Sequence, residues 1–313
     1  MSFELGRTYS GYEFLEIANQ TSTTIAYRVR NTLADRLELL YVLPETGEDD
    51  PQRRERFLRE MRLRARLLHA NIPGFLNATE LDGHLVLTTE LVKGRPLAER
   101  LKGGPLPWRE ACGLMEQVLS ALECAHEFGV VHRDVSPESI LVTREGSVEL
   151  SNFGMAKGLS SPALTQAGAI FGNASYISPE QARGTGELDC RSDIYSAGAV
   201  LYHMLCGRPP FTAKSEFELM VAHVKETPQA PSAFHRGVPA ALDAAVLKAL
   251  AKEPAQRYAN CAAFAEALAE AGTAPAEAPV ADGPERRFKA RLMYAGGAAL
   301  AILLAVVWLL VGR

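Results

Sequence analysis

The sequence lacks the cysteine pattern of a disulfide framework or a zinc centre. Its five cysteines are odd in number and contain no CxxC pair; they are Cys112, Cys124, Cys190, Cys206 and Cys261. We therefore expect reduced thiols that pack as small apolar side chains, and no metal site. The N-terminus also lacks a basic stretch followed by an apolar run, so no signal peptide is expected.

An excess of basic residues is missing as well. The formal net charge is -4 at pH 7, whereas a protein that tracks a nucleic-acid backbone normally carries a positive excess. Nucleic acid is therefore not an expected partner. Apolar and charged residues occur in the proportions of an ordinary globular protein, so composition alone indicates no function.

Charge is absent from one long run near the C-terminus, residues 292–311. A helix of about 20 apolar residues crosses the roughly 30 Å hydrocarbon core of a bilayer. The basic residues before the run favour the cytoplasmic side of a membrane; they are Arg286, Arg287, Lys289 and Arg291. We expect a single-pass tail anchor in the inner membrane, with the preceding domain in the cytoplasm. A buried core helix is the alternative for this run.

A linker separates the predicted span from the folded part of the chain. Residues 271–285 are rich in proline and alanine and show no periodicity, which is typical of a semi-extended spacer. Together with the basic residues that follow, they make a linker and juxtamembrane segment over residues 271–291.

Short β-rich runs dominate the first part of the chain. They predict strands over residues 12–17, 24–30, 36–43, 74–80 and 84–90. Asp82 and Gly83 between the last two runs form a favoured hairpin turn. Apolar residues near helical spacing from Phe57 to Leu68 predict one helix that begins at Pro51. The sequence thus predicts a small β-rich lobe with one helix over residues 1–93.

The pattern turns helical after residue 93. One apolar face continues from Trp108 to His126 and predicts a long helix. A larger helical lobe is therefore expected over residues 94–270.

Five motifs occur in a fixed order along the two predicted lobes. They are HRD at 132–134, NFG at 152–154, SPE at 178–180, RSDIYSAG from Arg191 and KEPAQRY from Lys252. With these motifs, residues 10–265 resemble the bacterial, Hanks-type members of the Ser/Thr protein kinase family. The resemblance implies an α+β, two-lobe kinase fold, in which complete sites transfer the ATP γ-phosphate with Mg²⁺.

Several positions that bind the phosphates in this family are changed. The three expected glycines of the phosphate-covering loop are replaced by Asn19, Thr21 and Thr24, and a Cβ at these positions hinders close approach of the backbone. Tyr41 stands where the strand lysine is expected, and the first lysine of the chain is Lys93. Arg28 is the alternative cation.

The adenine pocket is changed independently. Leu39 stands where the family has an alanine, and Ala26 replaces the usual valine opposite. This exchange moves side-chain volume into the expected place of the adenine ring.

The metal positions and the surroundings of the base are also changed. Asn152 replaces the metal-binding aspartate and Ser139 replaces the second ligand, and neutral oxygens are poorer ligands for Mg²⁺. Asp134 keeps the position of the base, but Ser136 and Asn173 replace its usual lysine and threonine neighbours. We predict that Asp134 is not productive and caps backbone amides of its loop.

Positions that hold the kinase fold together are kept. In the family they include a buried ion pair, an aspartate that binds the catalytic-loop backbone, and the helix glutamate that orients the missing lysine. The kept residues are Glu60, His132, Arg133, Glu180, Asp193 and Arg257.

This selective loss predicts a membrane-tethered pseudokinase that acts as a scaffold or binding module and needs neither ATP nor a metal. Two alternatives remain: an atypical active Ser/Thr kinase that uses ATP and Mg²⁺, and a nucleotide-binding switch without catalysis. The expected partner is a protein that is acidic or lies in the membrane, because the helix after Pro51 carries seven arginines. The predicted docking residues are Arg54, Arg59 and Arg62.

Overall fold

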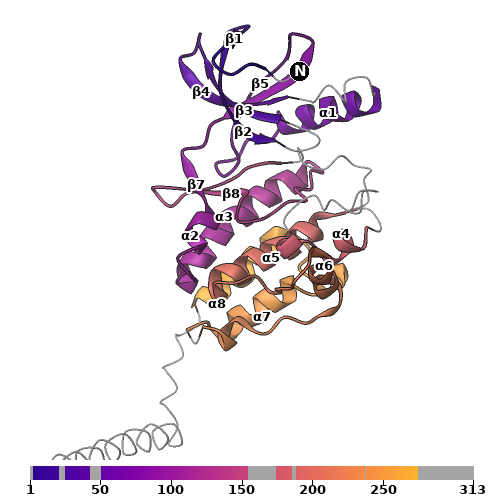
Figure 1. The fold of residues 1–313 in the computed structure, drawn as a ribbon. Coiled ribbons are helices and arrows are strands. Elements are labelled where there is room, and N and C mark those ends of the chain that lie inside the picture. Colours follow the sequence, from indigo (N-terminus) through magenta and orange to yellow (C-terminus); the bar gives the residue numbers. More distant parts are fainter. Residues whose placement is uncertain are drawn as a thin grey trace, which may run out of the picture. The chain divides into compact units, whose positions relative to one another are not determined.

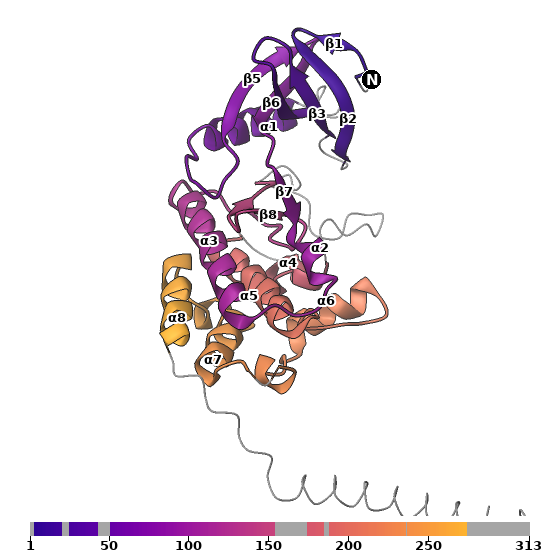
Figure 2. The ribbon, with the colours of Figure 1, turned by 90° about the vertical axis from the view of Figure 1, so that its left-hand side faces the viewer.

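The computed structural model describes residues 3–20, 25–42, 51–153, 174–184, 188–235 and 237–273, without the side chains of residues 51–54, 56, 57 and 60. Contacts group Met1–Ala274 into one compact unit, which has a strand-rich and a helix-rich lobe (Figures 1 and 2). The predicted two-lobe architecture is confirmed. Residues 274–313, with most of the predicted linker and the whole predicted span, lie outside the described residues, whereas residues 271–273 end helix α8 (Cys261–Thr273). Among the described residues, no helix is long and apolar enough to cross a membrane.

The small lobe is a six-stranded antiparallel sheet in the order β1-β2-β3-β4-β6-β5. Its strands are β1 (Thr8–Tyr9), β2 (Tyr12–Gln20), β3 (Ile25–Asn31), β4 (Arg36–Val42), β5 (Phe75–Leu81) and β6 (His84–Glu90). Asp82 and Gly83 join β5 to β6 with φ values of 49° and 87°, the left-handed conformation that a tight hairpin turn requires. The five predicted strands are confirmed to within three residues at each end; β1 was not predicted.

The sheet buries side chains on both faces because successive residues of a strand point to opposite sides. One face is aromatic and centres on Phe14, which stacks on Phe3 with ring centroids 4.5 Å apart. The other face packs on helix α1 (Pro51–Arg64). Its buried residues are Ala26, Tyr41, Met61, Leu85 and Leu87. The second face holds the strand positions at which the family binds nucleotide.

Helix α1 is shorter than the sequence periodicity predicted. After Arg64 the helix tightens, because Arg66 and Leu67 donate to carbonyls three residues back at 3.1 and 2.9 Å. Leu67 is buried but belongs to the core of the large lobe, whereas Leu68 is 82% exposed. The apolar spacing continues past the helix end because Leu67 is buried in the core of the large lobe and not in that of the small lobe.

The large lobe packs its helices around a central one, α5. The helices are α2 (Leu97–Leu101), α3 (Trp108–Glu127), α4 (Pro179–Arg183), α5 (Cys190–Cys206), α6 (Glu216–Lys225), α7 (Ala240–Ala249) and α8 (Cys261–Thr273). From Ser192 to Leu205, every residue of α5 except His203 is buried. A three-stranded sheet completes the lobe with strands β7 (Gly94–Pro96), β8 (Ile140–Thr143) and β9 (Val148–Leu150). The long predicted helix is α3.

The SPE motif forms the start of α4 and fixes it to the HRD loop. Ser178 accepts a hydrogen bond from the Gln181 N–H at 3.3 Å, and the Gln181 side chain accepts one from the Ser178 N–H at 3.1 Å. This is a capping box, with Pro179 in the first helical turn. Gln181 Nε2 also donates to the Arg133 carbonyl at 2.8 Å, so the helix start and the loop hold each other in place.

Candidate functional site

Tyr41 occupies the strand position at which the family has its lysine. It is 5% exposed and lies between Ala26 of β3 and Leu87 of β6. The Arg64 guanidinium lies over its ring, with Cζ 5.7 Å from the centroid, which is a cation–π distance. Burial raises the pKa of Tyr41, and this outweighs the nearby charge of Arg64 and the hydrogen bonds with Thr89 and Arg64. Tyr41 is thus a neutral, packed side chain.

The cavity that the described residues form next to Tyr41 is small. A cavity of about 30 Å³ is lined by Tyr41, Arg64, Leu67, Ile72, Pro73, Phe75, Thr89, Leu150, Ser151, Asn152 and Phe153. This volume suits about one water molecule, whereas ligand pockets usually measure roughly 300 to 1,000 Å³. Sequence reasoning did not single out Arg64. Its spacing of three residues from the buried Met61 was the available signal, since such residues share a helix face.

Leu39 and Arg28 are neighbours across β4 and β3. Leu39 is half-buried against the cluster that contains Tyr41, so its side chain is part of the packing of this face. The guanidinium of Arg28 forms an ion pair with Glu16 at 3.2 Å. The alternative cation of the small lobe therefore already has a carboxylate partner.

Some predicted site residues are exposed or lie outside the described part of the chain. Asn19 is exposed near the end of β2, opposite Ala26. The predicted site positions outside the description are Thr21, Thr24, Asn173 and the side chain of Glu60.

His132 holds the HRD loop against the turn after β9. It is 2% exposed, its Nε2 lies 2.8 Å from the Ser151 carbonyl oxygen, and its Nδ1 accepts the Asp134 N–H at 3.2 Å. The network assigns the proton to Nε2, which donates to Ser151. Burial lowers the pKa of His132 and outweighs the opposing charge of Asp193. The ring is therefore neutral, and Phe153 packs against it edge-on at 4.6 Å.

Ser139, at the second metal position, is buried and hydrogen-bonded within its own loop. It is 1% exposed, and its Oγ donates to the Ser136 carbonyl at 3.0 Å and accepts the Ser136 N–H at 3.1 Å. Ser151 bonds to the Ser139 carbonyl through its N–H and its Oγ, at 2.8 and 2.9 Å. These bonds turn the Ser139 hydroxyl into the loop, so it offers no ligand atom to the cleft.

Asn152, at the first metal position, lines the small cavity beside Tyr41. Its φ is 65°, a left-handed conformation that asparagine and aspartate adopt more readily than other non-glycine residues. The backbone here accommodates either residue, so the replacement by asparagine removes a negative charge without requiring a different turn.

Asp134 faces a separate hollow of about 460 Å³. This hollow is lined by Asp134, Ser136, Glu138, Ala174, Ser175, Glu216 and Leu219. We predicted that Asp134 caps the loop amides, but within the described residues the Ser136 amide is capped by Ser139. Asp134 shares its hollow with two further carboxylates and, among the described lining residues, with no lysine or arginine. The described part of this hollow therefore offers no cation to balance a transferred phosphate.

Asp193 holds the backbone of the HRD loop in place through hydrogen bonds. It is 1% exposed, and its carboxylate accepts the backbone N–H groups of His132 at 2.7 Å and Arg133 at 2.8 Å. A third contact joins it to His126 Nε2 at 2.7 Å. Burial raises the pKa of Asp193, but the hydrogen bonds from His126 and from the Arg133 N–H are among the effects that lower it, and the net shift is downward. The carboxylate is therefore ionised.

Arg257 and Glu180 form a bidentate ion pair that ties α4 to the segment before α8. The two N–O distances are 2.7 and 2.9 Å, and the Arg257 side chain is 0% exposed. Ser192 donates to the same carboxylate at 2.7 Å. Arg257 also donates to three backbone carbonyls, those of Arg191, Ala251 and Lys252. The N–H groups of this guanidinium thus all have hydrogen-bond acceptors within the protein.

The proposed docking arginines lie on α1. Arg59 and Arg62 are exposed, and the side chain of Arg54 lies outside the described atoms. No described contact occupies Arg59 or Arg62, so the structure leaves both side chains on the surface.

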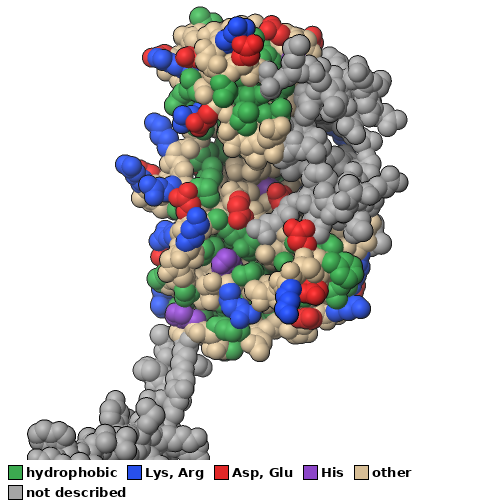
Figure 3. All heavy atoms as spheres, viewed as in Figure 1, with side chains coloured by type: hydrophobic (Ala, Val, Ile, Leu, Met, Phe, Trp, Pro, Cys, Tyr) green, Lys and Arg blue, Asp and Glu red, His purple; other side chains and the backbone are tan. Residues whose placement is uncertain are grey.

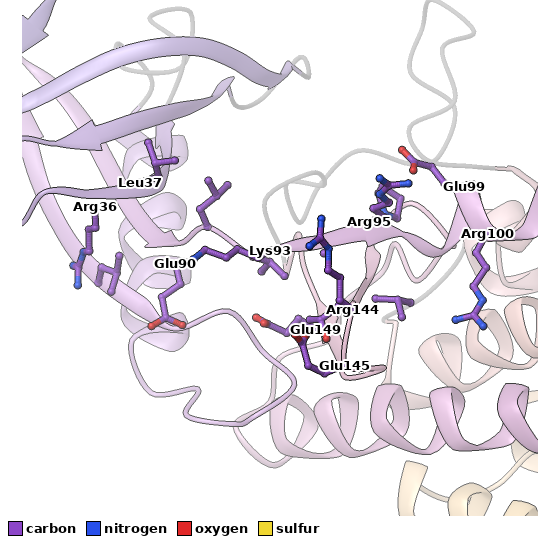
Figure 4. Close-up of a pocket in the computed structure, with 17 residues that line it drawn as sticks. Arg36, Leu37, Glu90, Lys93, Arg95, Glu99, Arg100, Arg144, Glu145 and Glu149 are labelled. Atoms are coloured by element: carbon purple, nitrogen blue, oxygen red, sulfur yellow. The ribbon is translucent and has the colours of Figure 1, made fainter.

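A larger hollow lies beside the connection between the lobes and contains none of the catalytic positions. It measures about 1220 Å³ and mixes both charges: its charged lining residues are Arg36, Glu90, Lys93, Arg95, Glu99, Arg100, Arg144, Glu145 and Glu149 (Figure 4). Figure 3 shows basic side chains gathered along this edge, over β7 and α2. Burial, and then the charge of Glu90, raise the pKa of Glu149. This is a groove of mixed charge, distinct from the nucleotide positions.

Comparison with known proteins identifies the family. The protein kinase domain model matches residues 27–269. The serine/threonine-protein kinase PrkC of Bacillus subtilis is 35% identical over 257 residues, which cover 81% of this chain and 39% of PrkC. The serine/threonine-protein kinase PknB of Mycobacterium leprae is 39% identical over 237 residues, 74% of this chain and 38% of PknB. The chain thus spans less than half the length of these relatives.

A solved structure of a bacterial kinase domain is also similar to this chain. The crystal structure of the PknI kinase domain of Mycobacterium tuberculosis matches with a TM-score of 0.65 and 28% identity, and the match covers 87% of this chain and 100% of that one. The ordered motifs, the two lobes and these matches agree. The chain belongs to the protein kinase family, and its homologues are bacterial, Hanks-type Ser/Thr kinases.

Proposed function

We propose that the protein is a pseudokinase, a kinase-fold binding or scaffolding module without efficient phosphotransfer. The observation that carries this proposal is Tyr41. In place of a lysine, a neutral aromatic side chain lies buried beneath Arg64, beside a cavity that suits about one water molecule. Phosphate bound there would need a cation and a much larger space.

The metal positions support the same proposal. The hydroxyl of Ser139 is bonded within its loop, and Asn152 contributes no charge. Removal of one preorganised electrostatic group lowers a catalysed rate by roughly 10²- to 10³-fold. Rate losses within one site are not simply multiplicative. Here, however, the strand lysine, the glycines of the phosphate-covering loop and both metal positions are all replaced. Useful turnover is therefore not expected.

An active Ser/Thr protein kinase is the second candidate, and the names of the relatives favour it. PrkC and PknB are both named serine/threonine-protein kinases. Asp134 also remains at the edge of a hollow of about 460 Å³, on a loop that Asp193 and His132 hold in place. In this candidate the protein binds ATP and Mg²⁺ and transfers phosphate to protein Ser or Thr. A nucleotide-binding switch is intermediate between the two candidates.

We further propose that the kinase-like domain is tethered to the inner membrane and faces the cytoplasm. The uncharged run at residues 292–311 and the basic residues before it support this topology. The partner would be a protein with an acidic surface or a neighbouring membrane protein, which the exposed Arg59 and Arg62 would contact.

The deciding experiment uses the full chain purified in detergent. Thermal unfolding is followed with and without millimolar ATP and Mg²⁺, and phosphate incorporation is followed with radiolabelled ATP. For a pseudokinase we expect no rise in Tm, whereas a ligand at 100 times its Kd would stabilise the protein by about 2.7 kcal/mol. Incorporation that disappears in Asp134→Asn would establish the active kinase instead, and a rise in Tm without incorporation would establish the switch.

A further inference from the structure

A group of metal-ligand side chains lies where α3, α5 and α8 meet, helices that Figure 2 shows side by side. Glu123 and His126 lie near the end of α3, and Cys261 is the first residue of α8. One potential ligand atom of each residue, namely a carboxylate oxygen, Nδ1 or Nε2, and Sγ, lies within 4.8 Å of the others. These residues come from distant parts of the chain, and no spacing pattern in the sequence connects them.

The histidine of this group is held in one orientation. Its Nε2 lies 2.7 Å from the carboxylate of Asp193, which is buried and ionised, so the proton belongs on Nε2. Nδ1 then carries a lone pair, which accepts a hydrogen bond from the Cys261 thiol at 3.6 Å. Metal-bound histidines are usually oriented in this way, with the other ring N–H donated to a carboxylate. Loss of the thiol proton on metal binding would leave this nitrogen available as a ligand, with Asp193 supporting the ring from its other side.

The spacing of nitrogen and sulfur fits one metal ion between them. Zinc binds sulfur at about 2.3 Å and histidine nitrogen at about 2.0 to 2.1 Å, and a tetrahedral angle between these bonds places the two atoms roughly 3.5 Å apart. The observed 3.6 Å matches this separation. Thiolate and imidazole together suit zinc and exclude the hard cations Mg²⁺ and Ca²⁺ as preferred occupants.

Glu123 retains capacity for a third bond. One of its oxygens accepts the N–H groups of Cys261 at 2.7 Å and Ala262 at 3.1 Å. A carboxylate has about four lone-pair sites, so these two bonds leave others open. Glu123 is half-buried, whereas the side chain of His126 is 8% exposed and Cys261 is fully buried.

We propose that Glu123, His126 and Cys261 form a zinc site, with water in the fourth position. On binding, the Cys261 S–H bond breaks, the proton leaves to solvent and a sulfur–zinc bond forms, with no change in oxidation state. The ion joins α3 to α8. Through His126 and Asp193 it also supports the HRD loop. This proposal does not depend on whether the protein transfers phosphate.

The test uses Co²⁺ as a spectroscopic probe for zinc, because Co²⁺ bound to thiolate gives a charge-transfer absorption that Zn²⁺ lacks. The full chain in detergent, reduced and freed of metal, is titrated with Co²⁺ and then with Zn²⁺, and proton release is followed in weak buffer. The variants are Cys261→Ser, which removes the thiolate, and Glu123→Gln, which keeps an oxygen to cap α8. Cys124→Ser, a half-buried thiol of α3 outside the group, is the matched control.

We expect one Co²⁺ per chain with a thiolate band, displaced by Zn²⁺, and release of about one proton per ion. Cys261→Ser should lose the band, Glu123→Gln should weaken binding by at least about tenfold, and Cys124→Ser should behave as the unaltered chain. Unfolding curves without metal verify that each variant is folded. Absence of a band in the unaltered chain, or a band of equal affinity in both Cys261→Ser and Glu123→Gln, overturns the proposal.

Discussion

Replacement of Tyr41 by lysine restores the family residue in name, but we expect it to destabilise the protein without restoring ATP binding. The side chain is 5% exposed, and the Arg64 guanidinium lies 5.7 Å from the ring centroid. A lysine would place an ammonium group in this buried space next to an existing cation. It would also remove the ring on which Arg64 packs.

The magnitude follows from this geometry. At an effective dielectric constant of about 20, two like unit charges separated by 5.7 Å repel by roughly 3 kcal/mol. Loss of the cation–π contact adds roughly 0.5 to 2 kcal/mol. The sum of about 3 to 5 kcal/mol corresponds to a fall in Tm of roughly 6 to 20 °C for a domain of this size.

The assay is thermal unfolding of the full chain in detergent, with and without ATP and Mg²⁺. Tyr41→Met is the matched control, because it removes the ring but introduces no charge, and Tyr41→Phe keeps the ring over Arg64. We expect the order of Tm to be Phe above Met above Lys. Should Tyr41→Lys be as stable as Tyr41→Met, or gain a rise in Tm from ATP and Mg²⁺, the site is not packed as we describe and phosphate binding needs only the lysine.

Three further predictions concern stability and the membrane. Arg257→Met should lower the free energy of unfolding by about 3 to 5 kcal/mol because it leaves Glu180 unpaired; a loss below about 1 kcal/mol in denaturant titrations contradicts this. Burial and then the charge of Lys252 lower the pKa of His223 to about 3, so the unfolded chain binds the proton first and stability falls as pH drops from 6.5 toward 3. Protonation of His223 should lower the free energy of unfolding by about 1.4 kcal/mol at pH 5.5 relative to neutral pH. The His223→Gln variant should lack this loss; if its free energy of unfolding depends on pH as in the unaltered chain, the assignment is wrong. Replacement of Arg59 and Arg62 by glutamine should reduce recovery of acidic partners in cross-linking from membranes while Tm stays constant; equal recovery places the partner surface elsewhere.

The residue patterns were sufficient to predict the fold and the changed catalytic positions. Strands β3, β4 and β6 follow from local β-branched and alternating patterns, and the β5–β6 hairpin follows from Asp82 and Gly83, because such signals depend on near neighbours in the chain. The HRD, NFG and SPE motifs fixed which residue stands at each catalytic position. The periodicity predicted too long a helix at the end of α1, because Leu67 continues the apolar spacing but is buried in the core of the large lobe.

The contacts of the changed residues could not be predicted from these patterns. The place of Arg64 over Tyr41 depends on how α1 packs on the sheet, and the closed hydroxyl of Ser139 depends on the path of the loop. The contact between His126 and Cys261 joins residues 135 positions apart, and Asp193 approaches from a third helix. No local pattern encodes such contacts, because they arise from the packing of whole helices, which brings together side chains whose separation in sequence carries no signal of proximity.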